Sequence, residues 1–187
     1  MGTYHQLPSR PKQTPHIVEQ MFSFTGLALP TDLLETSQLA HLRIDTGTHF
    51  WIHPGSGSTS KNTPLEQLRQ TYESNSCKLP IIASFGEADS DLLNDFKKTF
   101  ANLDCTLIMP TTIADLLAKL AGKAAVFLGN DSGPTHLSAA LGIPTIVSYC
   151  STDPAIWKPL GLDVKIERNI RDNPEERTGL GHSSPSI

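Results

Sequence analysis

The chain has 187 residues, of which 38% are hydrophobic and 18% charged, and its net charge is −4. This length fits one domain with additional segments at its ends better than a two-domain enzyme. The composition provides enough apolar residues for a core and too little charge for a disordered chain. Lysine and arginine are scattered along the sequence, so nucleic acid is not an expected partner.

The cysteine spacing and the absence of long apolar stretches bear on the compartment. Cys77, Cys105 and Cys150 form no CxxC or Cys/His pattern, so neither a disulfide framework nor a zinc site is expected, and a reducing cytosol is the natural location. No apolar stretch approaches the roughly 18 to 20 residues that cross a bilayer. We therefore expect a cytoplasmic chain without a transmembrane segment, whose membrane contact, if any, is peripheral.

The two ends of the chain differ in composition from its middle. Residues 1–40 are interpreted as an N-terminal tail followed by a linker, with a lone helix possible over 16–26. Residues 169–187 are polar and lack the apolar area that offsets the entropy of ordering, so a disordered tail is expected. The folded domain is expected over residues 41–168.

Short apolar runs recur from about residue 48 and alternate with amphipathic stretches, which is typical of βαβ units around a parallel sheet. The expected strands are 48–52, 79–85, 105–109, 124–128, 144–149 and, more weakly, 162–166. Because the runs are continuously apolar rather than alternating, helices should cover both faces of the sheet. The sequence therefore predicts an α/β fold.

The stretches between these runs carry helix signals. Apolar residues over 112–121 follow the i, i+3, i+4, i+7 pattern, Thr112 with Asp115 matches a capping box, and Gly122 is placed for a C-terminal cap. Further helices are expected over 64–74, 89–101 and 133–141.

The loop after the first strand, residues 53–62, is rich in glycine and hydroxyl groups (HPGSGSTSKN). Glycines such as Gly57 let backbone N–H groups approach an anion, Ser56 adds a hydroxyl donor, and Lys61 adds a positive charge. The loop is neither a Walker A motif nor a full G-x-G-x-x-G motif, because Ser60 replaces the last glycine. Taken alone, it fits a flexible surface loop as well as a phosphate site.

The second loop, residues 129–136 (GNDSGPTH), joins the fourth strand to the following helix. Asp131 or Ser132 can cap that helix, and its N-terminus at Gly133 favours an anion. His136 follows in the first turn. Taken singly, these residues fit plain capping and packing roles; both loops, however, follow strand ends, where parallel sheets bind ligands.

Together the two loops resemble glycosyltransferase family 9, the heptosyltransferases of lipopolysaccharide core assembly. The resemblance rests on HPGSGSTSKNTPLEQL and, about 70 residues later, on FLGNDSGPTHLSAALGIPTIVSYCSTDPAIWKPLG, and it covers roughly residues 16–165. It implies the GT-B architecture, two Rossmann-like domains facing across a cleft, with this chain as the C-terminal, donor-binding half. In that family the catalytic base lies in the N-terminal domain, so no catalytic residue is assigned here and a fragment or split gene is expected.

The resemblance also implies roles for individual residues. It assigns the donor phosphates to Ser56, Gly57 and Lys61; the sugar and diphosphate to Asp131, Ser132, Gly133 and His136; the ribose to Glu87; and the base to Thr112. Thr63 departs from the family, which usually has an aromatic residue there.

The implied function is the donor-binding half of an inverting transferase that moves a sugar, heptose from ADP-heptose, to a lipid-linked saccharide of the lipopolysaccharide core, without a metal or other cofactor. A separate N-terminal half is an expected partner, and the site of action is the cytoplasm or the inner-membrane surface. The alternative is a non-catalytic nucleotide-sugar-binding remnant or regulatory module. A nucleotide-sugar epimerase would need its own acid and base, and the sequence offers no convincing carboxylate pair.

Overall fold

A computed structural model describes residues 16–26, 28–30, 33 and 37–168. The tails expected at 1–15 and 169–187 lie outside the described residues, and the domain limits 1–40, 41–168 and 169–187 stay a prediction. The strands are β1 His49–His53, β2 Ile81–Ser84, β3 Cys105–Ile108, β4 Ala124–Asn130, β5 Thr145–Tyr149 and β6 Val164–Arg168. The α-helices are α1 Ile17–Thr25, α2 Leu65–Ser74, α3 Ser90–Thr99, α4 Ile113–Lys123, α5 Gly133–Ala140 and α6 Pro154–Trp157.

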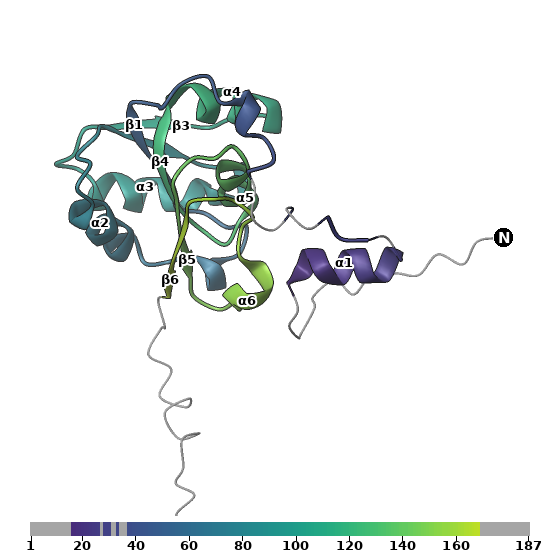
Figure 1. The fold of residues 1–187 in the computed structure, drawn as a ribbon. Coiled ribbons are helices and arrows are strands. Elements are labelled where there is room, and N and C mark those ends of the chain that lie inside the picture. Colours follow the sequence, from purple (N-terminus) through teal and green to yellow (C-terminus); the bar gives the residue numbers. More distant parts are fainter. Residues whose placement is uncertain (1–15, 27, 31–32, 34–36, 169–187) are drawn as a thin grey trace, which may run out of the picture.

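The six strands form one sheet in the order β3-β2-β1-β4-β5-β6, and every neighbouring pair is parallel. The chain moves outward from β1 to β3, returns to the centre, and then moves outward from β4 to β6 (Figure 1). The order therefore reverses between β1 and β4, and this switch point is where open α/β sheets bind their ligands. The Rossmann-like α/β fold implied by the sequence is confirmed.

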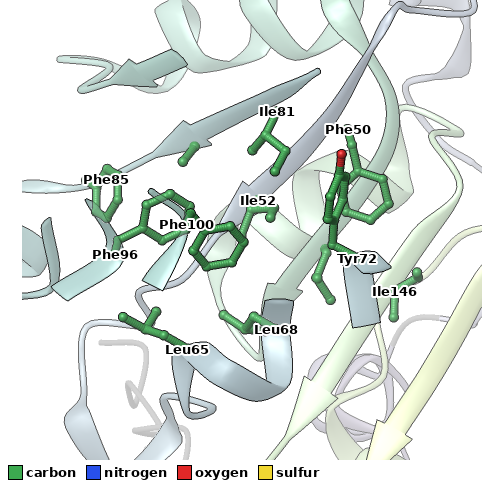
Figure 2. Close-up of a cluster of buried hydrophobic side chains, with 12 residues drawn as sticks. Phe50, Ile52, Leu65, Leu68, Tyr72, Ile81, Phe85, Phe96, Phe100 and Ile146 are labelled. Atoms are coloured by element: carbon green, nitrogen blue, oxygen red, sulfur yellow. The ribbon is translucent and has the colours of Figure 1, made fainter. Parts of the chain in front are cut away.

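One face of the sheet is covered by α2 and α3. Phe50, Ile52, Ile81 and Ile146 of the sheet form a cluster with Leu65, Leu68 and Tyr72 of α2 and Phe96 of α3 (Figure 2). The Phe96 and Phe100 rings stack with centroids 4.1 Å apart, and the Phe50 and Tyr72 rings meet edge to face at 5.0 Å. This packing fixes where α2 begins, and with it the end of the loop after β1.

The opposite face is covered by α4 and α5. Trp51, Ile82 and Phe127 of the sheet pack with Leu120 and Ala121 of α4, and Leu137 of α5 packs against the same cluster. Adjacent residues of β1, Phe50 and Trp51, thus enter opposite layers and are both fully buried. The expectation that both faces are covered is confirmed.

Local elements differ from the expectation in several places. Gly122 does not cap α4: the helix continues to Lys123, Ala124 is the C-cap, and Gly122 is not among the glycines with positive φ, because α4 passes directly into β4. Sequence patterns gave no sign of α6 or of the short 3-10 helices η2 Ala40–Leu42, η3 Thr59–Lys61 and η4 Glu87–Asp89. Helix α1 lies apart from the sheet (Figure 1), with the His16 ring 2.8 Å from the Lys158 carbonyl. Over the described residues, no helix is both long and apolar enough to cross a membrane.

Candidate functional site

The loops that follow β1 and β4 meet at the carboxyl edge of the sheet, next to the switch point. Lys61 ends η3 in the first loop, and Asp131 follows β4 directly. The Lys61 ammonium lies 3.1 Å from Asp131 Oδ2, although the two residues are 70 positions apart in the sequence. The structure therefore brings together the two loops singled out in the sequence.

Asp131 is the centre of a small polar cluster. Its carboxylate is 4% exposed. Oδ2 also accepts a hydrogen bond from the Thr152 hydroxyl at 2.8 Å, and Oδ1 lies 3.5 Å from His136 Nε2. Burial raises the pKa of Asp131, but the hydrogen bonds from His136, Thr152 and Lys61 and the charge of Lys61 outweigh it and hold the pKa below its ordinary value. Asp131 is thus an ionised, preorganised acceptor.

The loops are held together by Asn130, which is fully buried at the end of β4. Its side-chain oxygen accepts from the Thr63 backbone N–H at 2.9 Å, and its side-chain nitrogen donates to the Pro54 carbonyl at 2.7 Å. The Asn130 carbonyl accepts from the Thr135 hydroxyl at 2.6 Å. One amide therefore fixes both ends of the Pro54–Thr63 loop against the start of α5.

Helix α5 begins beside this cluster. Ser132 is its N-cap residue but makes no side-chain capping bond, and its hydroxyl lies 3.2 Å from that of Thr135. Gly133 is exposed, and a Cβ there would meet nothing within 4 Å. Pro134 has no N–H, and the Thr135 and His136 N–H groups donate to the Ser132 carbonyl. Gly133 therefore offers its N–H at the positive end of the helix dipole. The start of α5 is therefore an open, electropositive position next to Lys61 and Asp131.

The remaining residues of the first loop turn back on themselves. The Ser56 hydroxyl lies 2.6 Å from Asn62 Oδ1, and Gly57 takes the left-handed conformation with φ of 68°, which favours glycine. These contacts order the loop that carries Lys61, while the Ser56 hydroxyl is directed to the loop itself.

A pocket of about 240 Å³ opens beside the cluster, at the ends of β1, β2 and β3. Its walls are largely apolar and include Phe85, Pro110, Ile113 and Leu116, with Pro134 at the side of α5. Thr112 lines the pocket, as do Gly86 and the buried His53. Glu87 is exposed at the start of η4, directly after Gly86 but outside the lining.

The nine predicted site residues thus divide into groups. Lys61, Asp131 and His136 form one cluster beside Ser132 and Gly133. Ser56 and Gly57 lie in the loop that carries Lys61. Thr112 lines the adjoining pocket, and Glu87 lies on the exposed turn next to it. The predicted roles in binding stay predictions. Sequence reasoning missed Thr152, although it follows β5 and so belongs to the same edge of the sheet as the two loops.

A second buried polar group was also missed. His53 ends β1 and is 6% exposed; its Nδ1 lies 3.0 Å from the Ser84 hydroxyl and its Nε2 3.8 Å from Asp89 Oδ2. Burial lowers the pKa of His53, against the opposing effects of Asp89 and Ser84. The sequence signal was a histidine directly after an apolar strand. Among the described residues, no group of three or more histidine, cysteine, aspartate or glutamate side chains is arranged to hold a metal ion.

Comparison with known proteins identifies the family and the fold. The profile of Glycosyltransferase family 9 (heptosyltransferase) matches residues 51–180. A Haemophilus influenzae protein named "Putative glycosyltransferase" is 30% identical over 123 residues, which are 59% of this chain and 34% of that protein.

Solved structures share the fold. The Escherichia coli heptosyltransferase WaaC with ADP superposes with a TM-score of 0.55 at 21% identity, over 86% of this chain and 45% of WaaC. The Escherichia coli ADP-heptose lipopolysaccharide heptosyltransferase II gives 0.51 at 19% identity, over 88% of this chain and 48% of that one. The chain therefore spans between a third and a half of the length of these relatives. The profile match begins within β1, continues through β6 and includes both loops of the site, and the chain belongs to glycosyltransferase family 9.

Proposed function

We propose that the chain binds the nucleotide-sugar donor of a glycosyl transfer, ADP-heptose, for addition of heptose to a lipid-linked saccharide of the lipopolysaccharide core. The observation that carries this proposal is the meeting of Lys61, Asp131 and the start of α5 beside an apolar pocket at the switch point of the sheet. A cation and a helix N-terminus suit a diphosphate, and an apolar cavity beside them suits a nucleobase. WaaC, which shares the fold, was solved with ADP.

The proposed chemistry is inversion at the sugar carbon with departure of the nucleoside diphosphate. Lys61 and the Gly133 N–H at the start of α5 would stabilise the negative charge that grows on the departing phosphate. Lys61 is well suited to this, because its ammonium has three donors and Asp131 occupies one of them. These groups supply positive charge from the chain itself, so the proposal includes no metal ion.

The other predicted residues fit around this centre. Asp131 would accept hydrogen bonds from sugar hydroxyls, since its depressed pKa keeps it ionised at neutral pH, and His136 would approach the sugar or the diphosphate from the first turn of α5. Thr112 would lie against the base in the pocket. Glu87, exposed on η4, would reach the ribose.

Acceptor activation is assigned to another domain of the whole enzyme. Among the described residues, the buried carboxylates are Asp89 and Asp131, and a carboxylate with a lowered pKa, such as Asp131, is a weak base. We propose that an N-terminal Rossmann-like half supplies the base and the acceptor site, and that transfer takes place at the cytoplasmic surface of the inner membrane.

Calorimetric titration of the chain tests the proposal. ADP and ADP-heptose should bind, and both should raise the melting temperature because they bind the folded state; GDP and UDP at the same concentration provide the comparison for the base. No binding of any nucleoside diphosphate at millimolar concentration to a folded chain would refute it. Binding without sugar transfer, after the second half has been supplied, would favour a non-catalytic nucleotide-sugar-binding module.

A further inference from the structure

Four buried side chains with polar groups lie in a row beneath the pocket. The Trp51 indole N–H donates to the Ser84 hydroxyl at 2.8 Å, the Ser84 hydroxyl lies 3.0 Å from His53 Nδ1, and His53 Nε2 faces Asp89 Oδ2 at 3.8 Å. Trp51 and Ser84 are at most 1% exposed, and His53 and Asp89 are each 6% exposed. This row of side chains runs from the core of the sheet to its carboxyl edge, where the proposed ligand site lies.

Asp89, at the end of this row, contacts two loops at once. Its Oδ2 accepts a hydrogen bond from the Gly86 N–H at 2.9 Å, which holds the turn carrying Glu87. On its other side the carboxylate lies against Gly55, in the loop that carries Lys61. A Cβ built on Gly55 would come within 2.0 Å of the Asp89 carboxyl carbon, so this contact requires glycine.

The row of side chains that ends at Asp89 is separate from the polar cluster around Asp131. Asp131 joins the β1 and β4 loops on the phosphate side, whereas Asp89 joins the β1 loop to the β2 loop, on the side of the pocket and ribose. Ser84, His53 and Asp89 follow one another in the order of a hydrolase triad, but Ser84 is buried and its oxygen already accepts from Trp51. A nucleophilic role for Ser84 is therefore not supported.

We propose that Asp89 is a positioning residue that, through the hydrogen bond from Gly86 and the contact with Gly55, sets the distance between the loop that binds the donor diphosphate and the turn that binds the nucleoside. This inference rests on the proposed function and adds to it. A ligand that spans both loops gains from their fixed spacing, because its second half binds in an intramolecular step. A ligand that touches one loop does not.

The test compares three ligands on Asp89→Asn. ADP spans both loops, whereas adenosine contacts the nucleoside side and inorganic pyrophosphate the phosphate side. NMR titration of the folded full chain reaches the millimolar affinities expected for the two small ligands. Asp89→Asn should weaken ADP binding about tenfold, or about 1.4 kcal/mol, and change the affinities for adenosine and pyrophosphate by less than about threefold, or about 0.7 kcal/mol.

Gly55→Ala provides a second route to the same change. Its new methyl group must displace the Asp89 carboxylate, so the same selective loss of ADP binding is expected. Asp91→Asn is the matched control for charge, because Asp91 is exposed in the first turn of α3. Gly122→Ala is the matched control for the added methyl group, because a Cβ there meets nothing within 4 Å. Both controls should bind all three ligands as the parent does.

The His53 ring provides a readout independent of ligand. Asp89 is the charged group that faces His53, and its negative charge raises the pKa of the imidazole against the larger effect of burial. Asp89→Asn should therefore lower the pKa of His53, which is measured from the ring-proton shifts as a function of pH. Asp91→Asn should leave it unchanged.

The possible outcomes separate this inference from the proposed function. Loss confined to ADP, with a lower His53 pKa, supports the positioning role. Unchanged ADP binding in both variants, with the parent binding ADP, overturns the positioning role alone. Equal loss for all three ligands assigns Asp89 to folding and also overturns it. A parent that binds no ADP refutes the proposed function and this inference with it.

Discussion

Replacing Lys61 by alanine separates its contribution to folding from its contribution to ligand binding. In the free protein Lys61 is paired with Asp131, whose side chain is only 5% exposed, while that of Lys61 is 32% exposed. Exposed ion pairs contribute about 0–1 kcal/mol, and loss of one partner of a fully buried pair costs about 3–5 kcal/mol. Because Asp131 keeps its contacts with Thr152 and His136, Lys61→Ala should cost about 1–2 kcal/mol and lower the melting temperature by about 2–8 °C.

The effect on ADP binding should be larger than the effect on folding. The variant loses the proposed contact between the ammonium and the diphosphate, worth about 1.5–3 kcal/mol as a charge-assisted hydrogen bond. It also leaves the negative charge of Asp131 uncompensated beside the phosphates. ADP affinity should therefore fall by more than tenfold, because each 1.4 kcal/mol is a factor of ten.

Calorimetry with ADP and adenosine, together with thermal melts, measures both effects. Adenosine has no phosphate and should bind Lys61→Ala and the parent alike. The double variant Lys61→Ala/Asp131→Asn removes the unpaired charge, so it should recover part of the lost stability without recovering ADP affinity. Lys98→Ala, which removes an exposed lysine of α3, is the control for lost surface charge. ADP affinity within twofold of the parent, at a lowered melting temperature, would contradict the phosphate role and restrict Lys61 to folding.

Three further substitutions test the electrostatics and the architecture of the site. The pKa of Asp131 is held below its ordinary 3.8, so its charged form stabilises the fold above that pH. The free energy of unfolding that Asp131→Asn loses should therefore become smaller as thermal melts are recorded at lower pH, down through the folded-state pKa. Because burial lowers the pKa of His53 below 6.5, protonation of this histidine favours the unfolded state, and the parent should lose stability as the pH falls below 6.5. In the same melts, His53→Gln should lose less stability than the parent between pH 7.5 and 5.5. Asn130→Ala leaves the Thr63 N–H and the Pro54 carbonyl without this buried partner and should cost about 2–4 kcal/mol in urea denaturation; a cost below about 1 kcal/mol would show that water replaces the amide.

The sheet could be predicted from the sequence because its signal is local and repeated. Each buried parallel strand is a short apolar run, and each covering helix has its own periodicity and end signals. Gly122 shows where such local reasoning fails, because a glycine near a helix end caps it only when the chain must turn there, and α4 passes straight into β4.

The neighbourhood of the site could be predicted, but not its individual contacts. Parallel strands place their carboxyl ends on one edge, so loops after β1 and β4 were expected to be close. The direction in which each side chain points determines which carboxylate pairs with Lys61, and the spacing of residues along the sequence does not predict that direction. Thr152 and Asp89 were missed for this reason: Thr152 contacts Asp131 through its hydroxyl, and the Asp89 carboxylate lies against Gly55, where a Cβ would not fit.

Substitutions at Thr63 test how much an individual contact matters at a position where the family usually has an aromatic residue. Here Thr63 is 3% exposed, its hydroxyl lies 2.5 Å from that of Ser148, and Cys150 Sγ is 3.4 Å away. Thr63→Val keeps the shape and loses the hydroxyl, so it should cost about 0.5–1.5 kcal/mol. Thr63→Phe must force a ring between β4 and β5 and should cost about 1–3 kcal/mol or more, as overpacked cores do. Urea denaturation measures both, with Thr63→Ser as the variant that keeps the hydroxyl. If Thr63→Phe were as stable as the parent, the aromatic ring could be accommodated without disturbing these contacts, and the loop carrying Lys61 would be anchored by Asn130 and the backbone rather than by the packing of residue 63.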